Sequence, residues 1–531
     1  MAVIPSNIKF VGITPSVDTT ERRSAKINAE TEVYTLQDFS DSLSPDLTPI
    51  AVDGNSVSIA SDPTVTEQVM AVIKAIGVNS GIALVPNGTG AVIAAIPDGT
   101  DVGGNPRGDN AVDLQTLRYT NTEVASGYSS VIAGGEQNTA DGGRSVVGGG
   151  VYNRVLQGGS VIAGGLFNTI SNEESVISGG TDNTVSGLLS TIGGGWLNTV
   201  SSNLSTVSGG QNNTASTGSH ATVVGGRSNT SSGQYSISGG NGNTASGQSS
   251  VAFGENNTVT NRWSAVVGGS GNTAGQEHVV IGGKDNIANG EYSVSFGRSS
   301  ESLGFASFSM GYNANADGIG AIAFGQSTNA NGNYSFASGN YSNAYNAHSY
   351  SLGAELSAQA DYSFALGKNS DTQLRGQLAL ATVSLGTGYG TSQASQVVAV
   401  KQDTLTAGAT TILSLDGTGT TNLVIPYGNN RAWNVTVEYV GVCTVAGSGT
   451  TAVGDVVTGT DKFRFKRVGG TSTIGLVTNI ELTQDATMTS AVCSYAVGGS
   501  NDLQITFAAP TTANATTFRV VAKVSLVEVA W

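Results

Sequence analysis

The chain has 531 residues, of which 74 are glycine, 10 are proline and 11% are charged, and its formal net charge is −15. Abundant glycine without a Gly-X-Y period or much proline excludes collagen, and 38% hydrophobic residues at regular intervals exclude a disordered chain. No region has a basic balance, which excludes nucleic-acid binding by phosphate neutralisation.

The first part of the chain predicts an attachment region. Residues 1–60 are polar and irregular, and they are expected to form an N-terminal anchoring segment without a secretory signal. A short helix follows, because Asp62 suits the cap, Pro63 the first turn and Gly77 the exit. Its apolar residues have heptad spacing, which leaves open a small core helix or a short three-chain coiled coil. These residues are Val65, Val69, Val72 and Ile76.

Residues 61–123 are assigned to this helix and a small β collar. Two apolar runs between 81 and 120 each end in a turn signal. The tripeptide Arg107, Gly108 and Asp109 matches an integrin-attachment motif. We interpret it as a chance match, because any three residues recur often. No run of about 18 apolar residues occurs, so no membrane-spanning helix is expected.

An internal repeat is the strongest signal in the chain. One glycine recurs seventeen times from Gly135 to Gly367 at spacings of 14 to 16 residues. A large apolar residue usually stands three positions before it, and asparagine stands three positions after it in the first eleven repeats. Glycine and asparagine both suit tight turns. Each repeat therefore predicts two short strands and two turns, stacked about 4.8 Å apart as a β-solenoid shaft over residues 124–372.

A single coil of this kind is thin. It is expected to bury only one Val or Ile with a few small residues, too little to offset the entropy of ordering about 14 residues. Three copies facing a common axis would enclose the apolar column. The sequence therefore predicts an all-β homotrimer.

The units QSSVAFGENNTV and GAIAFGQSTNANGNYSFASGNYSNA resemble the head repeats of trimeric autotransporter adhesins. This resemblance implies a left-handed parallel β-roll wound from three chains. The asparagine-rich, 15-residue version departs from the usual 14-residue unit. A slightly enlarged loop is therefore expected in the first half of the shaft.

The remaining residues predict a neck at 373–394 and a C-terminal head at 395–531. Short β-type runs separated by turn residues suit a β-sandwich or jelly roll. Cys443 and Cys493 both lie in apolar runs. Two buried free thiols are the preferred interpretation, with one disulfide as the alternative.

The head resembles the tip module of bacteriophage tail fibres through ILSLDGTGTTNLVIP, AWNVTVEYVGV and FRVVAKVSLVEVAW. This resemblance implies a receptor-facing or trimer-capping head. We therefore expect a phage tail fibre made in the host cytoplasm and carried on the virion. Its N-terminus would bind a tail or baseplate protein, and its C-terminus a host-surface glycan or other outer-membrane receptor. The alternatives are a bacterial trimeric surface adhesin and a tailspike that depolymerises polysaccharide.

No catalytic motif, metal site or cofactor is expected, and the chain is predicted not to be an enzyme. His278 and His348 share one column of the repeat but lie five coils apart, and His220 stands alone, so they are interpreted as surface histidines. Acidic residues of the shaft are scattered over turn positions, where they do not pair as glycosidase carboxylates do.

Receptor contact is predicted in the head. Trp433 alternates with apolar residues and is expected in the core rather than in a sugar platform. The candidate receptor-binding residues lie in the turn just before it. They are Tyr427, Asn429, Asn430 and Arg431.

Overall fold

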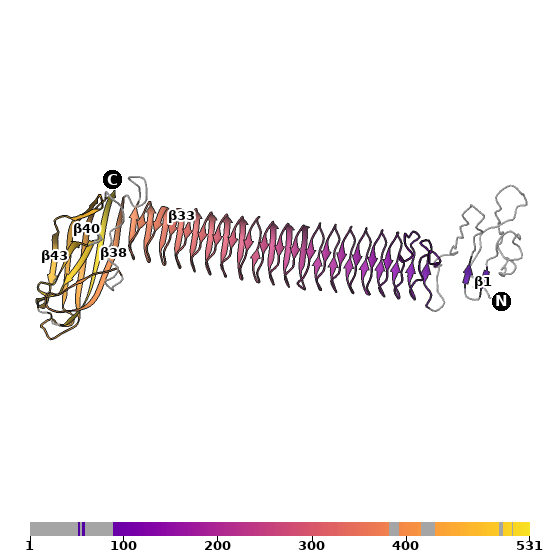
Figure 1. The fold of residues 1–531 in the computed structure, drawn as a ribbon, viewed down its shortest axis with the longest axis horizontal. Helices are drawn as coiled ribbons and strands as arrows, with labels where there is room; N and C mark the ends of the chain where they lie inside the picture. Colours follow the sequence, from indigo (N-terminus) through magenta and orange to yellow (C-terminus); the bar gives the residue numbers. More distant parts are fainter. Residues whose placement is uncertain are drawn as a thin grey trace, which may run out of the picture.

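The computed structural model describes residues 89–381, 392–415, 431–498, 503–511, 513 and 515–530, and the backbone of the hairpin β1 (Ala51–Asp53)–β2 (Ser56–Ser58). A long row of stacked strands ends at a set of larger sheets, the head (Figure 1). The all-β prediction is confirmed: within the described residues, the 3-10 turn Ala486–Met488 is the one helical element. Apart from β1 and β2, the predicted anchoring segment and the helix at 62–77 lie outside the described residues.

Two ladders of parallel strands build the shaft, and from β5 to β32 each coil contributes one strand to each ladder. The first ladder contains β3 (Val92–Ile93), β4 (Val112–Asp113), β5 (Val131–Ile132), β7 (Val146–Val147), β9 (Val161–Ile162), β11 (Val176–Ile177), β13 (Thr191–Ile192), β15 (Thr206–Val207), β17 (Thr222–Arg227), β19 (Ile237–Asn241), β21 (Val251–Glu255), β23 (Ala265–Val266), β25 (Val280–Lys284), β27 (Val294–Arg298), β29 (Phe308–Tyr312) and β31 (Ile322–Gln326). The second contains β6 (Thr139–Ala140), β8 (Arg154–Val155), β10 (Thr169–Ile170), β12 (Thr184–Val185), β14 (Thr199–Val200), β16 (Thr214–Ala215), β18 (Thr230–Ser231), β20 (Thr244–Ala245), β22 (Thr258–Val259), β24 (Thr273–Ala274), β26 (Ile287–Ala288), β28 (Glu301–Ser302), β30 (Asn315–Ala316) and β32 (Asn329–Ala330). The last coils are β33 (Phe336–Ala344), β34 (Tyr350–Ala358), β35 (Phe364–Lys368), β36 (Asp371–Thr372) and β37 (Leu378–Ala381).

The recurring glycine is required by the close approach of neighbouring coils. Gly195 has φ +97, and a Cβ built on it would lie 2.1 Å from the carbonyl oxygen of Gly210 in the next coil. Any larger residue would therefore push two coils apart and strain the backbone.

The first half of the shaft buries more apolar surface than the sequence predicted. In the 15-residue coils both strands point a Val, Ile or Ala side chain inward, as Ile162 and Ile170 do with 0% exposure. The expectation of a single buried Val or Ile per coil is wrong for most of these coils, because the second strand also contributes one. These coils form a continuous apolar core of their own.

The second half has a different interior. In most 14-residue coils the inward residues are Ala or Ser, such as Ala323 and Ala330. The large residue three positions before the glycine, here Ile322, points to the outer side and is half-buried. The predicted inward column is therefore wrong here. One fewer residue separates the inward position from the glycine, and such a shift moves a side chain to the opposite face.

A ladder of buried asparagines runs through the first eleven repeats. Asn198 donates from Nδ2 to the carbonyls of Gly194 (3.0 Å) and Gly210 (2.9 Å) and to Oδ1 of Asn183 (3.1 Å). Its own Oδ1 accepts the backbone N–H of Asn213 at 3.0 Å. Each asparagine thus links its coil to both neighbours.

This ladder corrects the prediction that asparagine occupies the tight turns. The left-handed turn position is taken by the preceding residue, as in Leu197 with φ 56. The buried members of the ladder are Asn138, Asn153, Asn168, Asn183, Asn198, Asn213, Asn229, Asn243, Asn257, Asn272 and Asn286.

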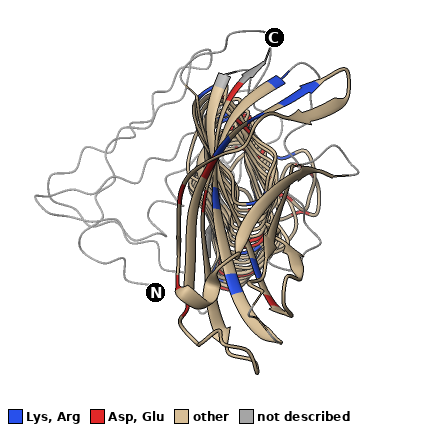
Figure 2. Cartoon of the chain, turned by 90° about the vertical axis from the view of Figure 1, so that its left-hand side faces the viewer, with Lys and Arg blue, Asp and Glu red and all other residues tan. Residues whose placement is uncertain are grey.

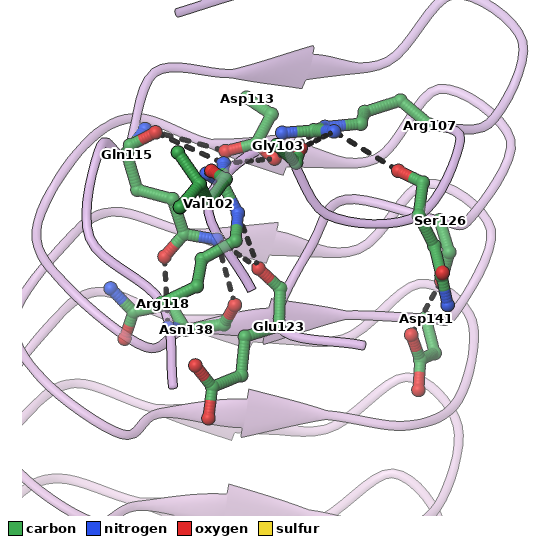
Figure 3. A network of polar contacts seen from close by, with 11 residues as sticks. Val102, Gly103, Arg107, Asp113, Gln115, Arg118, Glu123, Ser126, Asn138 and Asp141 are labelled. Carbon is green, nitrogen blue, oxygen red and sulfur yellow. Dashed lines mark hydrogen bonds and ion pairs between the residues drawn. The ribbon is translucent and has the colours of Figure 1, made fainter. Parts of the chain in front are cut away.

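A buried glutamine caps the N-terminal end of the ladder (Figure 3). Oε1 of Gln115 accepts the N–H of Asn138 at 2.9 Å, and Nε2 donates to the carbonyls of Asn138 (2.9 Å) and Glu123 (2.6 Å). The side-chain amide therefore does for Asn138 what a preceding coil does elsewhere. Terminal coils of solenoids need such a cap, because open strand edges template aggregation.

An ion-pair cluster completes this cap. Asp113 lies 2.8 Å from Nε of Arg107 and 3.0 Å from an Nη of Arg118, and all three side chains are at most 1% exposed (Figure 3). Because the Arg107 side chain is buried here, the tripeptide Arg107–Gly108–Asp109 is not displayed as an attachment motif, in agreement with its interpretation as a chance match.

The head consists of two antiparallel sheets. One contains β38 (Ser392–Leu405), β46 (Thr516–Ala530), β40 (Arg431–Val445), β41 (Val456–Val468), β42 (Thr471–Ile474) and β43 (Thr478–Gln484), and the other contains β39 (Thr410–Ile412), β45 (Leu503–Ala508) and β44 (Val492–Val497). β37 pairs with β38, so the first sheet continues directly from the last coil. The jelly-roll-like sandwich, the trimer and the left-handed coil stay predictions.

One apolar core lies within the head. Trp433 belongs to it and is 1% exposed, which confirms that this side chain is no surface platform. Cys443 and Cys493 are buried and free, as the preferred interpretation held. Burial raises the pKa of both thiols, so they are poor nucleophiles.

The asparagine ladder generates a test of what holds the coils together. Asn198→Ala removes the partner of the Asn213 N–H and of the Gly194 carbonyl and one of the two donors to the Gly210 carbonyl, so we expect the free energy of unfolding to fall by about 3 kcal/mol. Denaturant-induced unfolding measures this change. Ser201→Ala, at an exposed position of the next turn, is the control and should change it by less than about 0.5 kcal/mol. Equal effects of the two substitutions would contradict a stabilising ladder.

Candidate functional site

The candidate receptor-binding residues fall partly outside the structure. Tyr427, Asn429 and Asn430 lie outside the described residues. Arg431 is described and begins β40. The contacts of its side chain indicate the role of this residue in the head.

Arg431 pairs with a buried carboxylate. Its Nη1 forms an ion pair with Oε1 of Glu528 on the neighbouring strand β46, and the two side chains are 12% and 2% exposed. Removing one partner of such a pair leaves the other charged and buried, at a cost of about 3–5 kcal/mol. Arg431 therefore stabilises the head, whatever its contribution to binding.

A second buried carboxylate lies beside this pair, where shaft and head meet. Asp371, on β36 of the shaft, accepts hydrogen bonds from Nε2 of Gln359 at 3.1 Å and from Nε2 of Gln373 at 2.7 Å. Gln393, on β38 of the head, accepts the N–H of Asp371 and donates to its carbonyl, both at 2.8 Å. Nε2 of Gln393 also lies 3.4 Å from Oε2 of Glu528. We call Asp371, Gln393, Arg431 and Glu528 the joint cluster.

Both carboxyl groups of the joint cluster have raised pKa values. Burial raises the pKa of Asp371 above 3.8, against the hydrogen bond from Gln373 and the charge of Arg431. Burial likewise raises the pKa of Glu528 above 4.5, and Arg431 opposes this shift. Perturbed carboxyl groups of this kind occur both at functional sites and in structural ion-pair networks. Here Asp371 and Glu528 are 5% and 3% exposed in the single chain, so the cluster is suited to joining shaft and head.

A partly exposed apolar row marks the outer face of the second half of the shaft. Phe308, Phe324, Phe336, Tyr350 and Phe364 form a continuous series in which ring centroids lie 4.4 to 6.4 Å apart. We call these five residues the apolar stripe. Phe364 is 38% exposed, and the neighbouring Met310 and Leu380 are 47% and 48% exposed. A continuous row of partly exposed rings of this kind is a candidate interaction surface.

Charged residues do not gather into one patch. Seen from the head end, basic and acidic positions are scattered over head and shaft (Figure 2). No helix in the described part of the chain is long and apolar enough to cross a membrane.

Sequence reasoning missed the joint cluster and the asparagine ladder. The ladder had a signal, an invariant column of eleven asparagines, which a turn alone does not demand. The joint cluster had no signal in the sequence. Its four residues are spread over more than 150 positions and meet only through strand pairing.

Comparison with known proteins finds distant structural neighbours. No protein-family model and no curated protein sequence matches the chain. The tailspike protein of Acinetobacter phage vB_ApiP_P1 is 10% identical, with 84% of this chain and 79% of that chain covered and a TM-score of 0.21. The tailspike of Acinetobacter baumannii phage AM24 is 10% identical, with 82% and 76% covered and a TM-score of 0.17. Tailspike gp49 of Acinetobacter baumannii bacteriophage Fri1 is 9% identical, with 82% and 70% covered and a TM-score of 0.19.

The comparison overturns one prediction. Gp49 is described as a capsular polysaccharide depolymerase, so the prediction that the chain is not an enzyme is contradicted and is withdrawn. At these identities and TM-scores, the activity named for gp49 is a statement about gp49 alone.

The joint cluster generates a prediction about pH. Because the folded-state pKa of Asp371 is raised, the folded chain binds more protons than the unfolded chain above pH 3.8, and stability falls as pH rises through the folded-state pKa. Asp371→Asn removes the charge, so the decline should shrink, with a gain of roughly 2–4 °C in the unfolding temperature at pH 7.5. Calorimetry in steps from pH 4 to pH 7.5 measures the decline in the wild type and in the variant.

The control for this prediction is Asp361→Asn. Asp361 pairs with Arg375 on the surface, with a side chain 42% exposed, so its substitution should leave the pH dependence unchanged. An equal decline of stability with rising pH in the wild type and in Asp371→Asn would contradict the assignment to Asp371.

Proposed function

We propose that the chain is a homotrimeric bacteriophage tail fibre that recognises a host-surface glycan through its C-terminal head. The observation that carries the proposal is the apolar stripe, since one chain leaves its aromatic rings only half-buried, with Phe364 exposed, and a fibre of three chains would bury them. The resemblance of the repeats to trimeric adhesin heads, and of the C-terminal region to phage fibre tips, supports the same conclusion.

The geometry of the described chain suits this role. A long stack of coils separates the head from the other end of the shaft (Figure 1). The N-terminal segment would attach to a tail or baseplate protein of the virion, and the head would meet the host. The joint cluster fastens the head to the last coil through side chains from both, so a contact at the head is transmitted to a stiff shaft.

Receptor contact is proposed for the turn preceding β40, at Tyr427, Asn429 and Asn430. Tyrosine and amide side chains supply the ring face and the hydrogen-bonding groups that sugars require. Arg431 follows these residues as the first residue of β40, and its ion pair with Glu528 would fix the point where the chain enters the sheet.

The trimer generates a prediction about mass. Light scattering of the purified protein should give about three times 53.5 kDa. Replacing Phe336 and Phe364 together by Ser removes about 2–3 kcal/mol of apolar burial per ring, so the trimer should dissociate at lower concentration or lower temperature. Tyr341→Ser is the matched control, because Tyr341 is 51% exposed on another column in which Ser299 and Ser327 already occur. A monomeric wild type would refute the proposal.

The head generates a prediction about binding. Deleting residues 395–531 should abolish binding to host cells while circular dichroism still reports the shaft. The finer variant, Tyr427, Asn429 and Asn430 all to Ala, should weaken binding tenfold or more, since each 1.4 kcal/mol of lost contact is a factor of ten. The mass of this variant should stay that of a trimer.

Two outcomes would contradict the tip assignment: binding retained without the head, or binding unchanged in the triple variant. Incubation of the same protein with host polysaccharide tests the tailspike alternative, which predicts released oligosaccharide.

A further inference from the structure

A histidine on the outer turns of the shaft is held between two aromatic rings. The ring centroid of His278 lies 4.9 Å from that of Trp263 in the preceding coil and 4.6 Å from that of Tyr292 in the next. The rings are nearly parallel, at 23° and 15°. This stacking fixes the imidazole plane. The Nδ1 atom of His278 is buried and makes no hydrogen bond within the described chain.

Two carboxylates from successive coils lie beside this imidazole. Glu277 precedes His278 in the chain, and Glu291 precedes Tyr292 one coil further on. The potential ligand atoms of Glu277, His278 and Glu291 all lie within 4.8 Å of one another. The stacking of successive coils therefore places the carboxylates of Glu277 and Glu291 close together.

One nearby cation partly balances these charges. Nε of Arg262 lies 2.6 Å from Oε1 of Glu277, and the same guanidinium covers the Trp263 ring at 4.8 Å. Among the described residues Glu291 takes part in no ion pair within 4.0 Å. One negative charge thus remains without a close countercharge, in a group that includes His278, whose Nδ1 has no hydrogen-bond partner.

We propose that Glu277, His278 and Glu291 bind a divalent transition-metal ion of the zinc type. Imidazole nitrogen and carboxylate oxygen together suit Zn²⁺ better than Mg²⁺ or Ca²⁺, which prefer oxygen alone. Ligand bonds of about 2.0–2.2 Å require the three atoms to approach one another further, and rotation of the two flexible glutamate side chains supplies this movement. Three protein ligands leave a coordination position for water.

The sequence did not predict this site, because its three ligands come from two different coils. No Cys/His spacing typical of zinc occurs, and the earlier expectation of no metal site rested on that spacing. The site lies on the shaft, away from the head, so it does not depend on the proposed receptor contact.

The chain contains a matched comparison. His348 occupies the same turn column and is stacked between Tyr334 and Tyr362 at 5.2 and 4.8 Å. The positions equivalent to Glu277 and Glu291 are Ala347 and Asp361. His348 thus has the same ring environment but lacks one carboxylate.

The experiment is calorimetric titration of the untagged, full-length protein with ZnCl₂, and with MgCl₂ for comparison. We expect one Zn²⁺ per chain and no comparable Mg²⁺ binding. His278→Phe keeps the aromatic stack and should weaken Zn²⁺ binding at least tenfold, as should Glu291→Gln. His348→Phe should leave affinity and stoichiometry unchanged. Binding should also weaken at lower pH, because the ligands must be deprotonated.

Zn²⁺ binding that is absent in the wild type, unchanged in both His278→Phe and Glu291→Gln, or lost equally in His348→Phe would overturn the proposal. If His278→Phe does not fold, Glu291→Gln decides, because this substitution leaves the stacked rings in place.

Discussion

The structure depends on the vertical hydrogen bonding between coils. No coil satisfies its own backbone groups: the N–H of Thr199 bonds to the carbonyl of Asn213 in the next coil, and the N–H of Leu197 to the carbonyl of Thr181 in the previous one. The asparagine ladder adds side-chain bonds along the same direction. Because buried polar groups left without partners are costly, the register of each coil is fixed by its neighbours. The glycine column follows, since such close stacking leaves no room for a Cβ.

The change from 15-residue to 14-residue coils redistributes apolar surface. In the longer coils Val and Ile lie inside, and the coil has its own core. In the shorter coils Ala and Ser fill a narrower interior, while Phe and Tyr lie outside in the apolar stripe. The first half of the shaft therefore has an apolar core within one chain, whereas the second half leaves aromatic rings partly exposed, where the proposed trimer would cover them. A single-residue change in repeat length accounts for this difference.

The sequence predicted the stacked coils of the shaft, but it predicted poorly which side chains point into the interior of each coil. Period and glycine column were enough to predict stacked coils with two strands each, because only a solenoid repeats a turn at so constant a spacing. The direction of side chains was not predictable from period alone: Ile162 and Ile322 hold the same place relative to the glycine, but one points inward and the other outward. Their coils differ by one residue. The joint cluster could not be predicted, since strand pairing brings Glu528 to Arg431 across 97 residues.

The two ends of the second ladder are both capped by a glutamine side chain. The second ladder ends at β6 and at β36, beyond which no further parallel strand pairs, and a glutamine side chain provides the missing amide: Gln115 pairs with both backbone groups of Asn138, and Gln393 with both of Asp371. A side-chain amide carries the same donor and acceptor as a peptide unit, so it ends a ladder without leaving either group unsatisfied. A buried ion pair accompanies each glutamine, through Asp113 at one end and Glu528 at the other. Since Gln393 belongs to β38, the cap at the C-terminal end is also the attachment of the head. The residue that terminates the second ladder is therefore also one of the contacts that attach the head to the shaft, which is the connection that the proposed fibre would need.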